Sequence, residues 1–126
     1  MSVQDLLKNY QETPRLFQLV DRLTYAPPQK IYLKNLPGSA SQFVIGAAFL
    51  HPTCSQLNHI IVLNSAEEAA YFHNTLENLT GALDLFYFPS SFRNKKNFRL
   101  LNSSHIMLRT EALTRLAAGG NRKLYI

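Results

Sequence analysis

The 126-residue sequence predicts an α/β fold: a three-layer arrangement with a mostly parallel sheet and helices on both faces. Three observations lead to this prediction. From residue 30 onward, short apolar runs alternate with longer segments of helical periodicity, which is typical of repeated strand–helix units. Breaks containing Pro, Gly, Asn or Ser separate these segments. The run HIIVL at residues 59–63 is β-branched and almost continuously apolar, as in strands covered on both faces.

A helical lead-in is expected over residues 1–25, ahead of an α/β part over residues 26–126. The apolar residues of the opening segment recur at helical spacing. A second helix should follow, because Thr13 can cap it and Pro14 suits a first helical position. The sequence YAPP at residues 25–28 must end that helix, since proline lacks an amide donor and pushes its predecessor out of the helical region.

The α/β part is expected to contain four strands, at residues 31–33, 59–63, 83–88 and 123–126. Between them the sequence predicts three helices. The first, residues 39–50, is apolar on nearly every face and should be buried between layers. In the second, Ser65 and Glu68 form a capping-box pattern and Gly81 is placed to end the helix. The third should begin at Ser103 or Ser104 and end at the Gly119–Gly120 pair.

Composition favours a globular protein with a core. Hydrophobic residues make up 46% of the chain and charged residues 17%, and the mean hydropathy is -0.12. The longest apolar run is well short of the ~18 residues of a transmembrane helix, and no signal peptide is recognisable. The single Cys54 cannot form an internal disulfide and fits a reducing compartment, so we expect a cytoplasmic location without membrane partners.

The positive charge is concentrated in the last third of the chain. The total is +5, but residues 1–90 hold five Lys and Arg against seven Asp and Glu, a net charge of −2. Residues 91–126 hold eight Lys and Arg against Glu111 alone, a net charge of +7. This asymmetry indicates either contact with nucleic acid or another anionic surface, or acidic partners elsewhere in a larger protein. Both interpretations stay open at this point.

The turn at residues 35–41 is the first candidate site, because ligands of parallel α/β sheets bind beyond the carboxyl ends of strands. A phosphate-binding loop needs G-x-x-x-x-G-K-[ST]. If Gly38 takes the second glycine position, Leu33 falls on the first, Ser39 on the lysine and Ala40 on the hydroxyl. Three of the four defining positions are lost. A structural turn is therefore expected at Gly38, Ser39, Ala40 and Ser41, with weak anion binding at the helix N-terminus as the alternative.

A basic loop is the second candidate, as a nucleic-acid contact. It interleaves cations that can contact phosphates with aromatic rings that can stack on bases. Its residues are Phe92, Arg93, Lys95, Lys96, Phe98 and Arg99. The alternative is a solvated loop whose rings fold back onto the core. The four histidines and Cys54 show no metal-binding spacing, and no catalytic constellation is recognisable.

Four segments in order carry a resemblance to a known family: LPGSA at 36–40, IVLNSAEEAAYF at 61–72, FYFPSS at 86–91 and LRTEALTRL at 108–116. From about Leu16 to Ile126 the chain resembles the N-terminal, UvrB-like region of the bacterial transcription-repair coupling factors (Mfd). The resemblance implies a fold like UvrB domain 1a, related to P-loop NTPases. It also implies that this chain is a fragment of a much longer protein.

The resemblance implies a function for the whole family. Its members displace RNA polymerase stalled at DNA lesions, translocate on double-stranded DNA with ATP and magnesium, and recruit UvrA for nucleotide-excision repair. The N-terminal module has a degenerate nucleotide site: Gly38 matches the retained glycine, whereas Ser39 and Ala40 stand where an active loop carries Lys and Thr. We therefore expect no catalysis and no cofactor in this chain, and a scaffold for the UvrA-binding subdomain that contacts mainly neighbouring domains. A stand-alone nucleic-acid-binding module using residues 91–126 is the competing hypothesis.

Overall fold

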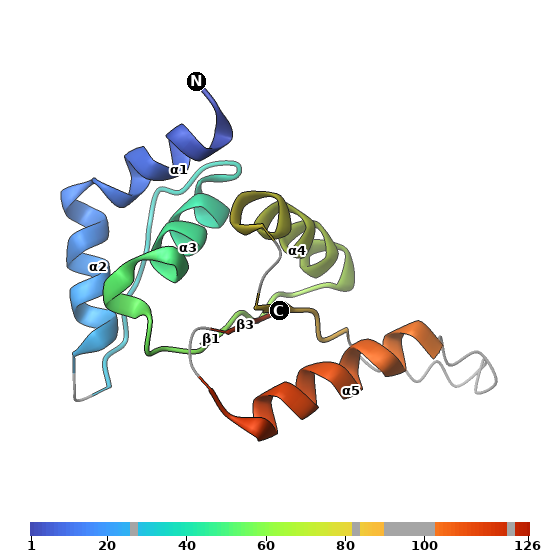
Figure 1. Ribbon diagram of the computed structural model, residues 1–126. Coiled ribbons are helices and arrows are strands. Elements are labelled where there is room, and N and C mark those ends of the chain that lie inside the picture. The colour runs from blue at the N-terminus through green and yellow to red at the C-terminus, as the bar shows by residue number, and fades with distance from the viewer. Residues whose placement is uncertain (26–27, 82–83, 90–102, 121–122) are drawn as a thin grey trace.

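The computed structural model describes residues 1–25, 28–81, 84–89, 103–120 and 123–126. Five α-helices, a short 3-10 helix and three strands follow one another in these residues (Figure 1). They are α1 (Val3–Gln11), α2 (Pro14–Thr24), α3 (Ala40–Leu50), η1 (Pro52–Cys54), β1 (His59–Ile60), α4 (Ala66–Thr80), β2 (Leu85–Phe86), α5 (Ser103–Ala118) and β3 (Leu124–Tyr125). The α/β class is confirmed.

Local signals place the helix ends close to where the sequence predicts them. Thr13 caps α2, with its hydroxyl accepting a hydrogen bond from the amide of Leu16. The Ser65 hydroxyl accepts from the amide of Glu68 at the start of α4. The helix ends at Gly81, whose φ of 82° lies in the left-handed region that glycine adopts without strain.

The three strands form a parallel sheet in the order β1-β3-β2. Leu124 of β3 lies opposite both His59 of β1 and Leu85 of β2, so the last strand of the chain is the central one. The chain leaves β1 toward α4 and leaves β2 toward α5. Figure 1 shows α3 and α4 on one side of the sheet and α5 on the other. The prediction of helices on both faces is confirmed.

One predicted strand is wrong. Residues 31–33 form no strand, and the segment lies beside α2, where it lines a groove with residues of that helix. Ile31 is half-buried there, whereas Tyr32 and Leu33 are exposed. An apolar run of three residues is too short to distinguish a strand from an extended segment that covers a helix.

The expectation that residues 59–63 are covered on both faces is also wrong. Only His59–Ile60 form a strand, although the Ile61 amide still donates to the Tyr125 carbonyl at 2.8 Å. Ile61 and Leu63 pack into the core, but 65% of Ile60 and 87% of Val62 is exposed. One face of this edge strand is therefore uncovered within the described residues.

In the part of the chain that the structure describes, the core consists of two hydrophobic clusters that meet at α3. One joins α1, α2 and α3, and its buried residues are Leu7, Leu16, Val20, Ala47, Ala48 and Cys54. The other joins α3 and α4 to β3, and its buried residues are Phe49, Phe72, Leu76, Leu79, Leu124 and Ile126. The predicted deep burial of residues 39–50 is confirmed for Gln42 and residues 46–49, whereas the remaining residues of α3 are half-buried and Ser39 is exposed. Within the described ranges, no helix has the length and hydrophobicity to span a membrane.

Candidate functional site

The turn before α3 lacks the features that a nucleotide site needs. Gly38 adopts a φ of 57°, as a tight turn requires. The Ala40 amide donates to the Pro37 carbonyl at 3.1 Å, and the Ser41 hydroxyl donates to the Gln42 side chain at 2.9 Å. These groups are occupied within the protein, and residues 35–41 carry no cation. The residues present therefore do not fit ATP with magnesium.

The same turn is also not placed where a nucleotide would bind in a parallel sheet. Because residues 31–33 are not a strand, the turn does not follow the carboxyl end of any strand of the described sheet. Gly38, Ser39 and Ser41 thus stand at the start of α3, away from the strand ends that make a binding crevice.

The basic loop, with Phe92, Arg93, Lys95, Lys96, Phe98 and Arg99, lies outside the described residues. Two cations of the last third that are described hold the backbone of the chain itself. Arg109 donates to the Pro89 carbonyl at 2.7 Å, and its guanidinium lies 4.3 Å from the centre of the Phe88 ring. Lys123 donates to the Gly119 carbonyl at 2.6 Å. These two side chains thus help to fix α5 and the β3 entry.

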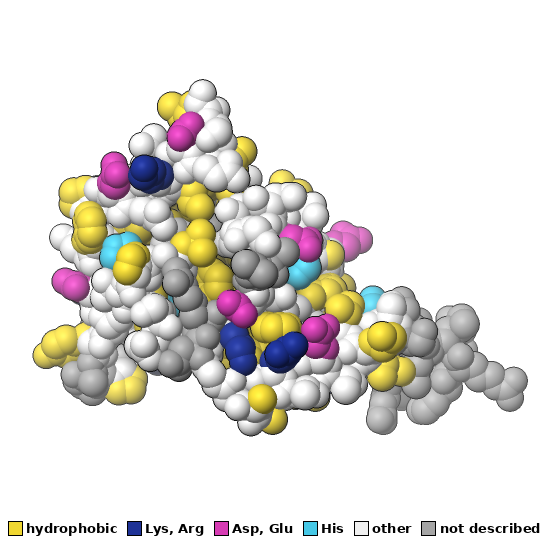
Figure 2. All heavy atoms as spheres, viewed as in Figure 1, with side chains coloured by type: hydrophobic (Ala, Val, Ile, Leu, Met, Phe, Trp, Pro, Cys, Tyr) yellow, Lys and Arg dark blue, Asp and Glu magenta, His cyan; other side chains and the backbone are white. Residues whose placement is uncertain are grey.

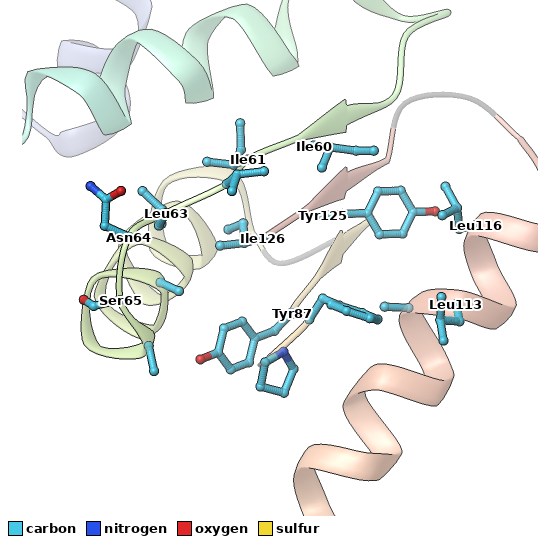
Figure 3. A pocket seen from close by; sticks show the side chains of 16 residues that line it. Ile60, Ile61, Leu63, Asn64, Ser65, Tyr87, Leu113, Leu116, Tyr125 and Ile126 are labelled. Carbon is cyan, nitrogen blue, oxygen red and sulfur yellow. The ribbon is translucent and has the colours of Figure 1, made fainter. Parts of the chain in front are cut away.

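An apolar crevice lies at the carboxyl ends of the strands instead. The chain turns to one face of the sheet after β1 and to the other face after β2, and β3 lies between these two strands. Such a switch point is where parallel α/β sheets bind ligands. The crevice encloses about 430 Å³ and is lined by residues 60–66, Ala69, residues 87–89, Ala112, Leu113, Leu116, Tyr125 and Ile126 (Figure 3).

The crevice has a floor from the sheet and a wall from α5. Ile60, Val62 and Tyr125 belong to the floor, and Figure 3 shows the Tyr125 ring extending toward Leu116 of α5. Leu113 and Leu116 remain 52% and 46% exposed, although Ala112 beside them is buried. The sheet and α5 therefore both contribute partly exposed apolar side chains to the crevice.

The Tyr125 hydroxyl is a buried polar group with an unusual environment. The residue is only 6% exposed, and the hydroxyl has no hydrogen-bond partner among the described residues. Burial raises the pKa of Tyr125, with the positive charge of Arg115 acting in the opposite direction. The hydroxyl is neutral at physiological pH, and it is a donor for which the described residues offer no acceptor.

The described lining of the crevice has no acid–base pair. Its polar side chains are Asn64, Ser65 and two tyrosines, and none of the described lining side chains is a carboxylate, an imidazole or a cation. His59 and His73 are half-buried next to the core: His59 packs edge to face on Phe49, and His73 lies 5.1 Å from the Tyr87 ring. Burial lowers the pKa of both histidines, and Glu77 partly opposes this at His73. In the described part of the chain, no three His, Cys, Asp or Glu side chains could together hold a metal ion.

Sequence reasoning missed this crevice because it assigned the binding edge to the turn after residues 31–33. A signal was available in the alternation of residues 60–63, where successive side chains of a strand must point to opposite faces.

No protein-family model, curated protein or solved structure matches the chain.

Proposed function

We propose that the chain is a non-catalytic interaction domain that packs against other protein domains through the crevice between α5 and the sheet. The observation that carries this proposal is the exposed apolar floor at Ile60 and Val62, next to the half-exposed Leu113 and Leu116. Contiguous exposed apolar surface of this kind marks sites of protein contact. Among the described lining residues no side chain is a carboxylate, an imidazole or a cation, which gives no support to acid–base catalysis in the crevice.

Following the resemblance carried by residues 36–40, 61–72, 86–91 and 108–116, we assign this domain to the UvrB-like N-terminal region of a cytoplasmic transcription-repair coupling factor. On this proposal, the finer fold is that of UvrB domain 1a. The parent protein would bind UvrA, RNA polymerase and double-stranded DNA and would use ATP and magnesium. This domain would position the UvrA-binding subdomain. The competing nucleic-acid module at residues 91–126 gains no support from Arg109 and Lys123, which bind the protein's own carbonyls.

Two measurements test this proposal. The first is ATP hydrolysis by the purified chain with magnesium, for which we expect no rate above background because the turn at Gly38 lacks the lysine and the metal-binding hydroxyl. Magnesium-dependent hydrolysis that disappears in a Gly38→Val variant would contradict the non-catalytic assignment.

The second measurement is calorimetric binding of the chain to a transcription-repair coupling factor whose own N-terminal region has been removed. We expect binding, and at least a tenfold loss of affinity in an Ile60→Asp/Val62→Asp variant, because two charges would be buried in an apolar contact. Met107→Asp is the matched control, since Met107 is 72% exposed on α5 and does not line the crevice. Equal affinities for all three proteins would exclude the crevice as the contact, and no binding at all would count against the family assignment.

A further inference from the structure

A second groove lies between α2 and the extended segment that follows it. It encloses about 500 Å³. Its lining comes from the end of α1, one face of α2, the extended segment and one residue of α3: Tyr10, Thr13, Arg15, Leu16, Gln18, Leu19, Arg22, residues 31–36 and Val44. The extended segment, which the sequence predicts as a strand, thus forms one wall of this groove. Figure 1 shows the segment running close to α2 and α3.

Three cations line this groove. Arg15 and Arg22 are seven residues apart on α2, which places them on the same face of the helix and about 10 Å apart along its axis. Lys34 belongs to the opposite wall. No Asp or Glu is among the described lining residues, and Asp21 is turned by about 100° around the helix from Arg22. Within the described part of the chain, these three cations have neither an ion pair nor a hydrogen bond.

Tyrosine rings stand among these cations. Tyr10 is held in place by stacking on Phe43, with ring centroids 5.3 Å apart. Tyr32 is 80% exposed, so most of its surface is open to a ligand. Unpaired cations that track a phosphate backbone, with an exposed ring on which a base can stack, are the two parts of a single-strand binding surface.

We propose that this groove binds single-stranded nucleic acid, with Arg15, Arg22 and Lys34 contacting phosphates and Tyr32 stacking on a base. A single strand is favoured over an acidic peptide because a carboxylate chain would leave Tyr32 without a stacking partner. It is favoured over a duplex because paired bases offer no free face. The site lies within residues 1–90, whose net charge of −2 conceals it, and it is distinct from the basic loop at residues 91–99. It does not depend on the crevice or on its partners.

The test is fluorescence anisotropy of a labelled oligothymidylate titrated with the chain at several salt concentrations. An Arg15→Gln/Arg22→Gln/Lys34→Gln variant should bind at least tenfold more weakly at low salt. Its plot of log affinity against log salt should be shallower by about 2, since each single-strand phosphate contact contributes about 0.7. Tyr32→Ala should also bind about tenfold more weakly but should keep the wild-type salt slope, because stacking releases no counterions.

Control variants make the outcome decisive. Lys8→Gln removes an exposed cation of α1 that does not line the groove, and Lys95→Gln/Lys96→Gln removes two cations of the basic loop. Both should bind nearly as wild type does, and circular dichroism melts should show every variant folded. The proposal is overturned if the chain does not bind the oligonucleotide, if only the loop variant loses affinity, or if poly-glutamate competes as well as an unlabelled oligonucleotide.

Discussion

The two faces of the small sheet differ in how completely they are covered. On the face toward α3 and α4, Leu124 is fully buried and Ile126 nearly so, and both belong to a cluster with Phe72 and Leu76. On the face toward α5, Tyr125 is buried, whereas Ile60 is 65% exposed in the neighbouring strand. Neighbouring residues of the sheet thus differ in burial according to the face on which their side chains lie. The comparison separates the residues that stabilise this domain from those available for contact with another molecule.

The difference arises from the number of helices on each face. Among the described residues, α3 and α4 cover one face, whereas only α5 lies on the other, where it contacts β2 at the far edge from β1. The space-filling view shows hydrophobic side chains at several places on the surface of the described residues (Figure 2). Full burial of an aliphatic side chain contributes about 1.5–3 kcal/mol. A partner that covered Ile60 and Val62 would therefore gain the stabilisation that the folded chain does not obtain from them.

Truncation of Leu76 should have the largest effect on stability, because it removes a core side chain on the sheet face covered by α3 and α4. Leu76 is fully buried between α4, α3 and β3, so Leu76→Ala should lower the free energy of unfolding by about 2–5 kcal/mol. Val62→Ala removes a side chain of similar chemistry from the open face, where 87% of it is exposed, and should change stability by less than about 0.5 kcal/mol. Urea denaturation of both variants measures the difference. Similar losses would show that the open face is also part of the core.

Much of the fold could be predicted from the sequence because its signals are local. The caps at Thr13 and Ser65, the end of α4 at Gly81 and the burial of residues 46–49 in the apolar helix α3 each depend on a few neighbouring residues. The pairing of strands is different, since it depends on contacts between residues far apart in the sequence. The run at 31–33 has strand-like composition, yet it lies in the wall of a groove with α2.

The candidate sites could be predicted less well for a related reason. The sequence alone shows that the turn at Gly38 has Ser39 and Ala40 where a phosphate-binding loop needs Lys and Ser or Thr, but its position away from the strand ends required the sheet topology. The groove of Arg15, Arg22 and Lys34 was hidden by summing charges along the chain. The i, i+7 spacing of the two arginines on a predicted helix was the one signal that could have indicated it.

Removal of the Tyr125 hydroxyl should have a smaller effect, and it sharpens the description of the open face. The hydroxyl is buried, and no partner for it exists among the described residues, so it incurs a desolvation cost without a compensating hydrogen bond. Tyr125→Phe should therefore raise the free energy of unfolding by about 1 kcal/mol, measured by urea denaturation. Tyr71→Phe, at a residue 62% exposed, is the matched control and should be nearly neutral. A destabilised Tyr125→Phe variant would indicate that the hydroxyl is bonded in solution.

The smallest expected effect concerns pH and the two half-buried histidines, His59 and His73. Burial lowers the pKa of His59 and His73 below the ordinary value of 6.5. As pH falls below about 7, the two histidines become protonated in the unfolded chain before they do in the folded chain. The unfolded state is therefore favoured, and the free energy of unfolding should decrease from about pH 7 toward pH 5. Above that window they contribute no pH dependence. Thermal melts at pH 7.5, 6.5 and 5.5 should show this decline, and it should be shallower in a His59→Leu/His73→Leu variant. NMR titration of the two imidazole rings gives the pKa values directly, and values at or above 6.5 would show that protonation is not opposed by burial.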